Sequence, residues 1–173
     1  FHVLVLPNMV DKAVIERNAI IQDFSLAESQ FEIIEGDITS SGLAIDPDKQ
    51  AQLELDVTHV FHLAAIYDLA VPKEIAYRVN VDGTRNVNDW AKTLTNIQRY
   101  TYFSTAFVAG KREGILYEDE LIKPPGFKNY YEETKYEAEV LVDALKSEVP
   151  VTIIRPGIVK GHSTTGETIK FDG

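Results

Sequence analysis

The amino-acid sequence predicts an α/β fold in which helices cover both faces of a parallel sheet. Short apolar runs rich in β-branched residues alternate with longer helical stretches along the 173 residues. No Asn-Gly pair or similar hairpin signal stands between neighbouring strands, so each strand is expected to reach the next through a helix. Such units are right-handed and place their strands parallel. The hydrophobic content of 45% is enough for one sizeable core, and one domain is therefore expected.

The elements follow one another in a regular order. The apolar runs predict strands at residues 1–7, 31–38, 57–65, 99–106 and 149–159. The helical stretches are expected at about 11–28, after residue 46, at 72–94 and at about 131–146. Asp46 can cap the short helix because its carboxylate can accept from free backbone N–H groups, and Pro47 suits the first helical position. The stretch 110–126, which contains Gly and Pro, is expected to be irregular.

The composition argues against several function classes. The formal net charge of −10 repels nucleic-acid backbones and anionic lipid surfaces, so no nucleic-acid partner is expected. The chain has no cysteine, which excludes disulfides and thiolate metal sites. His59 and His62 point to opposite faces of a strand and cannot share one metal ion, so packing or hydrogen bonding is expected. No apolar run is long enough to span a membrane and no leader-like segment opens the sequence, so a cytoplasmic location is expected.

Parallel sheets of this class bind ligands outside the carboxyl ends of their strands, where the strand order reverses. The residues at the strand ends are therefore the first candidates for a functional site. They are Pro7 and Asn8, Gly36 to Ile38, His62 to Ala65, Ser104 to Ala106, and Arg155 to Gly157. Small side chains and hydroxyl groups at these places let a flat, polar ligand approach the backbone closely.

Each candidate also has a purely structural interpretation. Asp37 suits a turn, because its carboxylate can bond to its own backbone. Ala64 and Ala65 suit a crowded junction between a strand and a helix. Ser104 and Thr105 can satisfy loop backbone groups, and strand alternation sends their side chains to opposite sides. No Gly-x-Ser-x-Gly pattern surrounds the two hydroxyls, so nucleophilic hydrolysis is not expected.

Tyr131 and Lys135 lie one helical turn apart in the segment YYEETK, so their side chains share one face of a helix. An exposed amphipathic pair has the same spacing, and with eight tyrosines the pattern arises by chance about one time in two. The pair gains meaning from its context, because it follows a hydroxyl-bearing strand end through a long loop.

Six short motifs occur in an order seen in one large enzyme family. They are GDI, HLAA, NVDGT, STAFVAG, YEETK and RPGIVKG. With them, residues 1–161 resemble the extended short-chain dehydrogenases/reductases, which are Rossmann-type, NAD(P)-dependent enzymes of the epimerase/dehydratase superfamily. The stretch FHLAAIYDLAVPKEIAYRVNVDGTRNV and the motif STAFVAG resemble the fatty acyl-CoA reductase and thioester reductase branch, the male sterility type of NAD-binding domain. Sugar epimerases usually have a tyrosine at the position of Ala109.

The resemblance implies catalytic roles for three residues. Tyr131 would be the general acid that protonates the carbonyl oxygen of the substrate. Thr105 would hydrogen-bond the same oxygen and stabilise its developing negative charge. Lys135 would bind the ribose hydroxyls of the cofactor, and its ammonium would draw the phenol pKa down from about 10 toward neutrality.

The resemblance also implies a cofactor site at the strand ends. Asp37 would accept from the adenine amino group, Ile38 would flank the ring, and Asn80 would have a structural or water-binding role. The residues expected at the cofactor are Asp37, Ile38, Leu63, Ala64, Ala65, Asn80, Ser104, Lys135, Pro156, Gly157 and Val159. NADP is expected by analogy with the branch, and NAD is the alternative, because Pro7 and Asn8 after the relevant strand are uncharged.

The sequence departs from the family pattern at both ends. The glycine-rich turn that binds the pyrophosphate would precede Phe1, and the substrate-binding region would follow Gly173. Residues 1–173 are therefore expected to be a partial NAD(P)-binding Rossmann domain. By analogy with extended members, a homodimer through the long helices 72–94 and 131–146 is expected.

The resemblance implies reduction of an acyl thioester, carried by coenzyme A or a protein-bound thiol, to an aldehyde or an alcohol. Two alternatives on the same scaffold are a sugar-nucleotide epimerase or dehydratase and a hydroxysteroid-type dehydrogenase. A third hypothesis, from another class, is a non-catalytic NAD(P)-binding sensor or scaffold. The presence of Thr105, Tyr131 and Lys135 favours an enzyme.

Overall fold

The structure, a computed structural model, describes residues 1–158 and 161–168. The strands are β1 (His2–Val5), β2 (Glu32–Glu35), β3 (His59–His62), β4 (Arg99–Phe103) and β5 (Val151–Ile154). The α-helices are α1 (Val10–Asp23), α2 (Pro47–Asp56), α3 (Lys73–Ala76), α4 (Gly83–Thr93) and α5 (Tyr130–Leu145). Shorter turns are η1 (Pro7–Met9), η2 (Glu28–Gln30), η3 (Ser41–Ala44), η4 (Tyr77–Asp82) and η5 (Ala106–Ala109). Strands and helices therefore alternate as predicted.

The strands pair in two parallel sheets instead of one continuous sheet. β1 pairs with β2, while β4 lies between β3 and β5. Tyr102 is opposite His62 on one side and Ile153 on the other, so the carboxyl ends of β3, β4 and β5 lie at the same edge. Within the described residues β1 and β3 each have one edge without a strand beside it, and this gap divides the predicted sheet into two parts.

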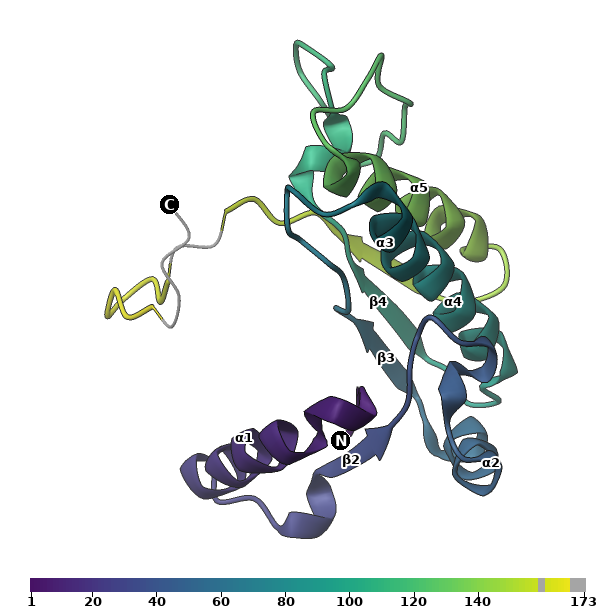
Figure 1. Cartoon of the computed structure of the whole chain (residues 1–173), viewed down its shortest axis with the longest axis vertical. Helices are drawn as coiled ribbons and strands as arrows, with labels where there is room; N and C mark the ends of the chain where they lie inside the picture. Colours follow the sequence, from purple (N-terminus) through teal and green to yellow (C-terminus); the bar gives the residue numbers. More distant parts are fainter. Residues whose placement is uncertain (159–160, 169–173) are drawn as a thin grey trace.

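Helices lie on both sides of the strands, as predicted. Figure 1 shows α1 against β2 on one side, and α2, α4 and α5 on the other. The burial of β3 agrees with this arrangement, because Val60 and His62 are buried whereas Phe61 is 62% exposed on the opposite face. The buried core residues are Ile34, Leu43, Ile45, Leu53, Val60, Val87, Leu94, Tyr100, Tyr102, Ala138, Val142, Leu145 and Val149.

Polar caps explain where two of the helices begin. The Asp46 carboxylate accepts from two backbone N–H groups of the first turn of α2, and Pro47 occupies its first position, which confirms the predicted start. At α5 the Asn129 side chain accepts from the Glu132 N–H, while the Glu132 carboxylate accepts from the Lys128 N–H, each at 2.9 Å. This reciprocal cap starts α5 one residue before the predicted position.

Several elements are shorter than predicted. The helix expected at about 11–28 ends early, because Ser25 adopts a left-handed φ of 52° and the Leu26 N–H turns back to the Ile21 carbonyl at 3.0 Å. The helix expected at 72–94 is present over residues 73–93, and its middle turns form the π-helical segment η4 between α3 and α4. The strands stop before their apolar runs do, because the next residues leave the ladder to form turns such as η5.

The stretch 110–126 is an irregular loop, as predicted, and it is closed at its base. The Lys111 N–H donates to the Gly126 carbonyl at 2.9 Å. Gly110 has a φ of +54°, and a Cβ on it would lie 2.5 Å from the same carbonyl oxygen, so the closure requires glycine. Inside the loop Arg112 pairs with Glu120 at 2.7 Å. The loop therefore returns to its starting point before α5 begins.

Candidate active site

The carboxyl ends of β3, β4 and β5 bring three of the predicted strand-end segments together. The Ser104 N–H donates to the Ile154 carbonyl at 2.8 Å, and the Ala106 N–H donates to the Pro156 carbonyl at 3.0 Å. The parallel pairing of β3 with β4 places residues 63–65 at the same edge. Most of the residues predicted for the site therefore lie along one edge of the three-stranded sheet.

The end of β2 belongs to the other sheet and is tied to α4. The Asn86 amide donates to the Ile38 carbonyl at 2.8 Å. The Ile38 side chain packs where Gly83 has none, since a Cβ on Gly83 would lie 2.8 Å from the Ile38 Cδ1. The Asp37 carboxylate accepts from the Thr39 N–H at 2.7 Å. Asp37 thus has the turn role that the sequence left open, and a place at the adenine stays a prediction.

Ser104 and Thr105 have different surroundings, as strand alternation predicts. The Ser104 hydroxyl donates to the carboxylate of Glu139 on α5. The Thr105 hydroxyl oxygen accepts from the Phe107 N–H at 3.2 Å and so caps η5. In the described part of the chain the Thr105 hydroxyl proton has no acceptor, whereas the Ser104 proton is taken by Glu139. Thr105 is thus the hydroxyl that can donate to a ligand.

Lys135 is buried, so the interpretation of Tyr131 and Lys135 as an exposed pair is wrong for the lysine. Lys135 is only 3% exposed, and Tyr131 is half-buried. The Lys135 Nζ donates to the Tyr102 Oη and to the Phe103 carbonyl, both at 2.8 Å. It also lies 4.3 Å from the centroid of the Tyr102 ring. Burial lowers the pKa of Lys135 to about 8, and the carboxylate of Glu139 partly opposes that change.

A buried ion pair, which sequence reasoning missed, lies one turn further along α5. The fully buried Glu139 carboxylate accepts from the Arg155 Nε at 2.9 Å and from its Nη2 at 2.5 Å. The same Nη2 donates to the Glu120 carbonyl at 2.7 Å, so Arg155 also holds the loop 110–126. The available signal was the spacing of Lys135 and Glu139, because residues four apart share one helix face.

His62 is a buried and neutral hydrogen-bond donor. Its Nε2 lies 3.0 Å from the Thr84 hydroxyl, which donates to the Asn80 carbonyl at 2.7 Å. Because the Thr84 proton is used in that bond, the His62 Nε2 carries a proton and donates it. Burial, and to a smaller extent the charge of Lys135, lower the pKa of His62 to about 3. His59 is exposed, which confirms that the two histidines point to opposite faces.

Asn80 joins two elements from inside the π-turn η4. Its side-chain oxygen accepts from the Ile66 N–H at 2.8 Å. Its amide nitrogen donates to the Ile66 carbonyl and to the Thr134 hydroxyl, both at 3.0 Å. These bonds fasten the segment after β3 to α5. They favour the structural role for Asn80 over a direct contact with a cofactor, because both amide protons are already used.

The remaining residues predicted at the cofactor are small or exposed. Leu63 is 61% exposed, Ala64 is exposed, and Pro156 is half-buried. A Cβ on Gly157 would meet nothing within 4 Å, so open space lies beside it. Val159 lies outside the described residues. These positions put small or exposed side chains along the strand ends, and their place at a cofactor stays a prediction.

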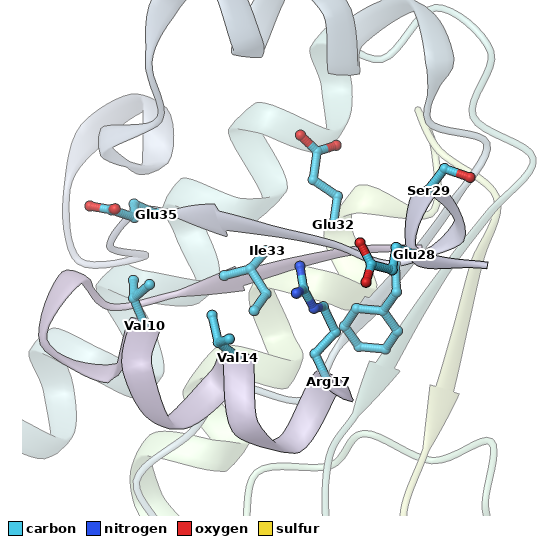
Figure 2. Close-up of a pocket in the computed structure, with 9 residues that line it drawn as sticks. Val10, Val14, Arg17, Glu28, Ser29, Glu32, Ile33 and Glu35 are labelled. Carbon is cyan, nitrogen blue, oxygen red and sulfur yellow. The ribbon is translucent and has the colours of Figure 1, made fainter. Parts of the chain in front are cut away.

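A pocket elsewhere in the structure lies between α1 and β2 (Figure 2). Val10 and Val14 of α1 face Ile33 of β2 across it. Its polar lining consists of Arg17, three glutamates and a serine. None of the residues predicted for the site lines this pocket. The surplus of carboxylates disfavours a phosphate-bearing ligand there, so it is not the candidate cofactor site.

The parallel α/β architecture, with polar and small residues gathered at the strand ends, defines the chain as a Rossmann-type domain. The family described as male sterility protein matches residues 8–173, and the chain belongs to this family. The match confirms the predicted membership of the extended short-chain dehydrogenases/reductases, in the branch of fatty acyl-CoA reductases and thioester reductases.

Three similar proteins illustrate the relationship. The chain is 32% identical to the fatty acyl-CoA reductase wat of Drosophila melanogaster over 75% of its own length and 30% of that protein. It resembles the terminal R domain of the myxalamid PKS-NRPS pathway with a TM-score of 0.78 and 30% identity, covering 95% of this chain and 43% of that one. It also resembles UDP-glucuronic acid 4-epimerase of Bacillus cereus in complex with NAD, with a TM-score of 0.62 and 26% identity. This similarity covers 82% of this chain and 43% of the epimerase. The chain thus spans less than half of each protein.

Proposed function

We propose that the protein is an NAD(P)H-dependent reductase that converts an acyl thioester, carried by coenzyme A or by a carrier protein, to an aldehyde or an alcohol. The main support is the environment at the end of β4, where the Thr105 hydroxyl has an unused proton and the Lys135 ammonium is buried. Family membership, and the fatty acyl-CoA reductase and R domain among the similar proteins, favour a thioester as the substrate.

Three side chains have separate roles in the reduction of the substrate carbonyl in this proposal. Tyr131 donates its phenol proton to the carbonyl oxygen, and Thr105 hydrogen-bonds the same oxygen through its unused proton. Lys135 bonds to Tyr102 and Phe103 rather than to the phenol, and in this proposal its ammonium binds the ribose hydroxyls of the cofactor that serves the same carbonyl.

The cofactor that this reaction needs is a reduced nicotinamide, which supplies a hydride when it is bound. One round consumes one proton, breaks the carbon–sulfur bond and yields an aldehyde and a thiol, and a second round yields the alcohol. NADP is the proposed cofactor, with NAD as the alternative. The residues proposed to hold it are Asp37, Ile38, Leu63, Ala64, Ala65, Lys135, Pro156 and Gly157. Ser104 and Asn80 support the site indirectly, because their side chains already bond to protein groups.

A sugar-nucleotide epimerase is the second candidate function. The likeness to UDP-glucuronic acid 4-epimerase favours it, because the two chains share 26% of their residues and the fold. The position of Ala109 counts against it, because sugar epimerases usually carry a tyrosine there. A non-catalytic sensor stays as a third candidate, which would bind a nicotinamide dinucleotide without turnover.

The experiment that tests the proposal follows the absorbance of reduced nicotinamide in the presence of the complete protein. NADPH and NADH are each supplied with acyl-CoA thioesters of several chain lengths and, in parallel, with UDP-sugars. Thioester-dependent oxidation of one cofactor supports the reductase, whereas interconversion of a UDP-sugar without net oxidation assigns the epimerase. Cofactor binding without any turnover assigns the sensor. The variant Tyr131→Phe serves as the catalytic control.

The assembly and the location of the protein are proposals that the sequence supports. The long helices expected at 72–94 (α3, η4 and α4) and at 131–146 (α5) are the surfaces proposed for a homodimer, and Val140 is 38% exposed on α5. Light scattering on the complete protein measures the mass of the assembly.

In the described part of the chain no helix is long and apolar enough to cross a membrane. A cytoplasmic location and residues 1–173 as part of a larger NAD(P)-binding domain remain predictions.

A further inference from the structure

We propose that Tyr102 is a positioning residue for Lys135 and that its hydroxyl holds the ammonium at the carboxyl end of β4. The catalytic consequence of this inference rests on the function proposed above, but the positioning itself does not. The hydroxyl oxygen of Tyr102 accepts from the Lys135 Nζ at 2.8 Å, and the Nζ lies 4.3 Å from the centroid of the same ring. The two distances together place the ammonium beside the phenol oxygen, so the hydrogen bond is the contact that holds it.

The strand geometry explains why Tyr102 can do this. Tyr100 and Tyr102 are two residues apart on β4 and so share one face of the strand, and both are fully buried on the side of α4 and α5. The two tyrosines have different partners, because the Tyr100 hydroxyl donates to Asn88 on α4 while the Tyr102 hydroxyl accepts from Lys135 on α5. Tyr100 is therefore a matched control in size, burial and secondary structure.

The bonds of Lys135 leave one donor for a ligand. An ammonium has three N–H groups, of which the Tyr102 hydroxyl and the Phe103 carbonyl take two. Within the described residues the third has no acceptor. Because Phe103 is the last residue of β4, the ammonium lies at the strand end. In the proposed function this third donor is the one that a ligand hydroxyl would accept from.

The charged and titratable groups around Lys135 come from three elements. Tyr102 faces it from β4, and His62 on β3 is close enough for the two charges to affect one another. From α5 the phenol of Tyr131 lies one turn before it and the carboxylate of Glu139 acts on it from one turn after, and that carboxylate is paired with Arg155 after β5. The only full negative charge in this set is therefore shared with an arginine. The Tyr102 hydroxyl is a dipole that stabilises the ammonium without neutralising it.

The first test measures the titration of Lys135 by NMR, through the shift of its Cε in the cofactor-free protein. Tyr102→Phe removes the acceptor and keeps the ring, so the charged form loses a partner and the pKa of Lys135, about 8 in the wild type, falls by about one pH unit. Tyr100→Phe keeps every contact of Lys135 and leaves the titration unchanged. Equal titration curves for the two variants overturn the proposal. Circular dichroism checks that both variants fold.

The second test connects positioning to turnover in the complete protein. In Tyr102→Phe we expect kcat/KM for the cofactor to fall about tenfold and the alkaline limb of the rate profile to move to lower pH, because a hydrogen bond to a charged group is lost. In a Lys135→Met background the same change has no further effect. A tenfold loss that persists without Lys135 overturns the proposal. If the wild type reduces no thioester, the proposed function fails, while the NMR titration still decides the role of Tyr102.

Discussion

Glu139 and Arg155 form a buried ion pair that joins the middle of α5 to the end of β5, with the Glu139 Oε1 2.9 Å from the Arg155 Nε and 2.5 Å from its Nη2. The same carboxylate accepts from the Ser104 hydroxyl at the end of β4. The Arg155 Nη2 also holds the carbonyl of Glu120 in the loop 110–126. Four segments around the candidate site are thus connected through one carboxylate and one guanidinium.

Removal of the buried carboxylate should destabilise the fold strongly. In Glu139→Ala, Arg155 and Ser104 lose their carboxylate partner and the Arg155 charge keeps only the Glu120 carbonyl, so we expect the free energy of unfolding to fall by about 3–5 kcal/mol. Asp143→Ala on the same helix is the matched control, because Asp143 pairs with Lys146 at the exposed surface. The control should change stability by less than about 1 kcal/mol. Urea unfolding measures the free energy of unfolding of both variants. Equal decreases in the two variants would show that the buried ion pair contributes no more to stability than the exposed one.

The sequence was sufficient to predict the alternation of elements and the edge where the candidate residues gather. Both follow from local patterns: apolar runs mark strands, and Asp46 and Pro47 mark the start of α2. The spacing of Tyr131 and Lys135 showed that they share a face, but it could not show that Lys135 is buried. Burial depends on β4 and β5, which are distant in sequence, and no local pattern encodes that packing.

Two other features were also beyond local patterns. The break between β1 and β3 depends on which strands become neighbours, and this depends on tertiary contacts. The hydrogen bond that takes the Ser104 proton requires Glu139 from another element, so the sequence could not separate the roles of Ser104 and Thr105. Alternation predicted only that the two hydroxyls differ in direction, and the structure supplies the partner of each.

The unused proton of Thr105 predicts a catalytic loss that depends on the hydroxyl and not on side-chain size. Thr105→Val keeps the shape but cannot donate to the substrate oxygen, so we expect kcat to fall about a hundredfold with cofactor affinity nearly unchanged. Thr105→Ser keeps the hydroxyl and should retain most activity. Steady-state kinetics and cofactor titration measure both variants. An equally active Thr105→Val enzyme would exclude Thr105 from the chemistry.

The phenol of Tyr131 should be essential for turnover and nearly irrelevant for cofactor binding. Tyr131→Phe removes the proton donor, and we expect kcat to fall about a thousandfold. The adjacent Tyr130, which is exposed, is the matched control, and Tyr130→Phe should keep normal activity. Fluorescence titration with reduced cofactor separates a loss of binding from a loss of chemistry. Turnover retained in Tyr131→Phe would refute the proposed general acid.

The buried His62 predicts a loss of stability in acid. Its pKa is lowered from 6.5 to about 3 because burial disfavours the imidazolium, so below pH 6.5 the unfolded chain binds a proton that the folded protein does not. Stability is therefore fully present above pH 6.5 and decreases by about 1.4 kcal/mol for each pH unit below it, until about pH 3. Urea unfolding at pH 7.5 and 4.5 measures this slope.

Two substitutions identify the group responsible for that slope. In His62→Gln the amide can still donate to the Thr84 hydroxyl but does not titrate, so most of the decrease between pH 6.5 and 4.5 should disappear. In His59→Gln the slope should stay as in the wild type, because His59 is exposed on the other face of β3. If His62→Gln keeps the full slope, other groups dominate the acid unfolding. If both variants lose it equally, burial of His62 is not its cause.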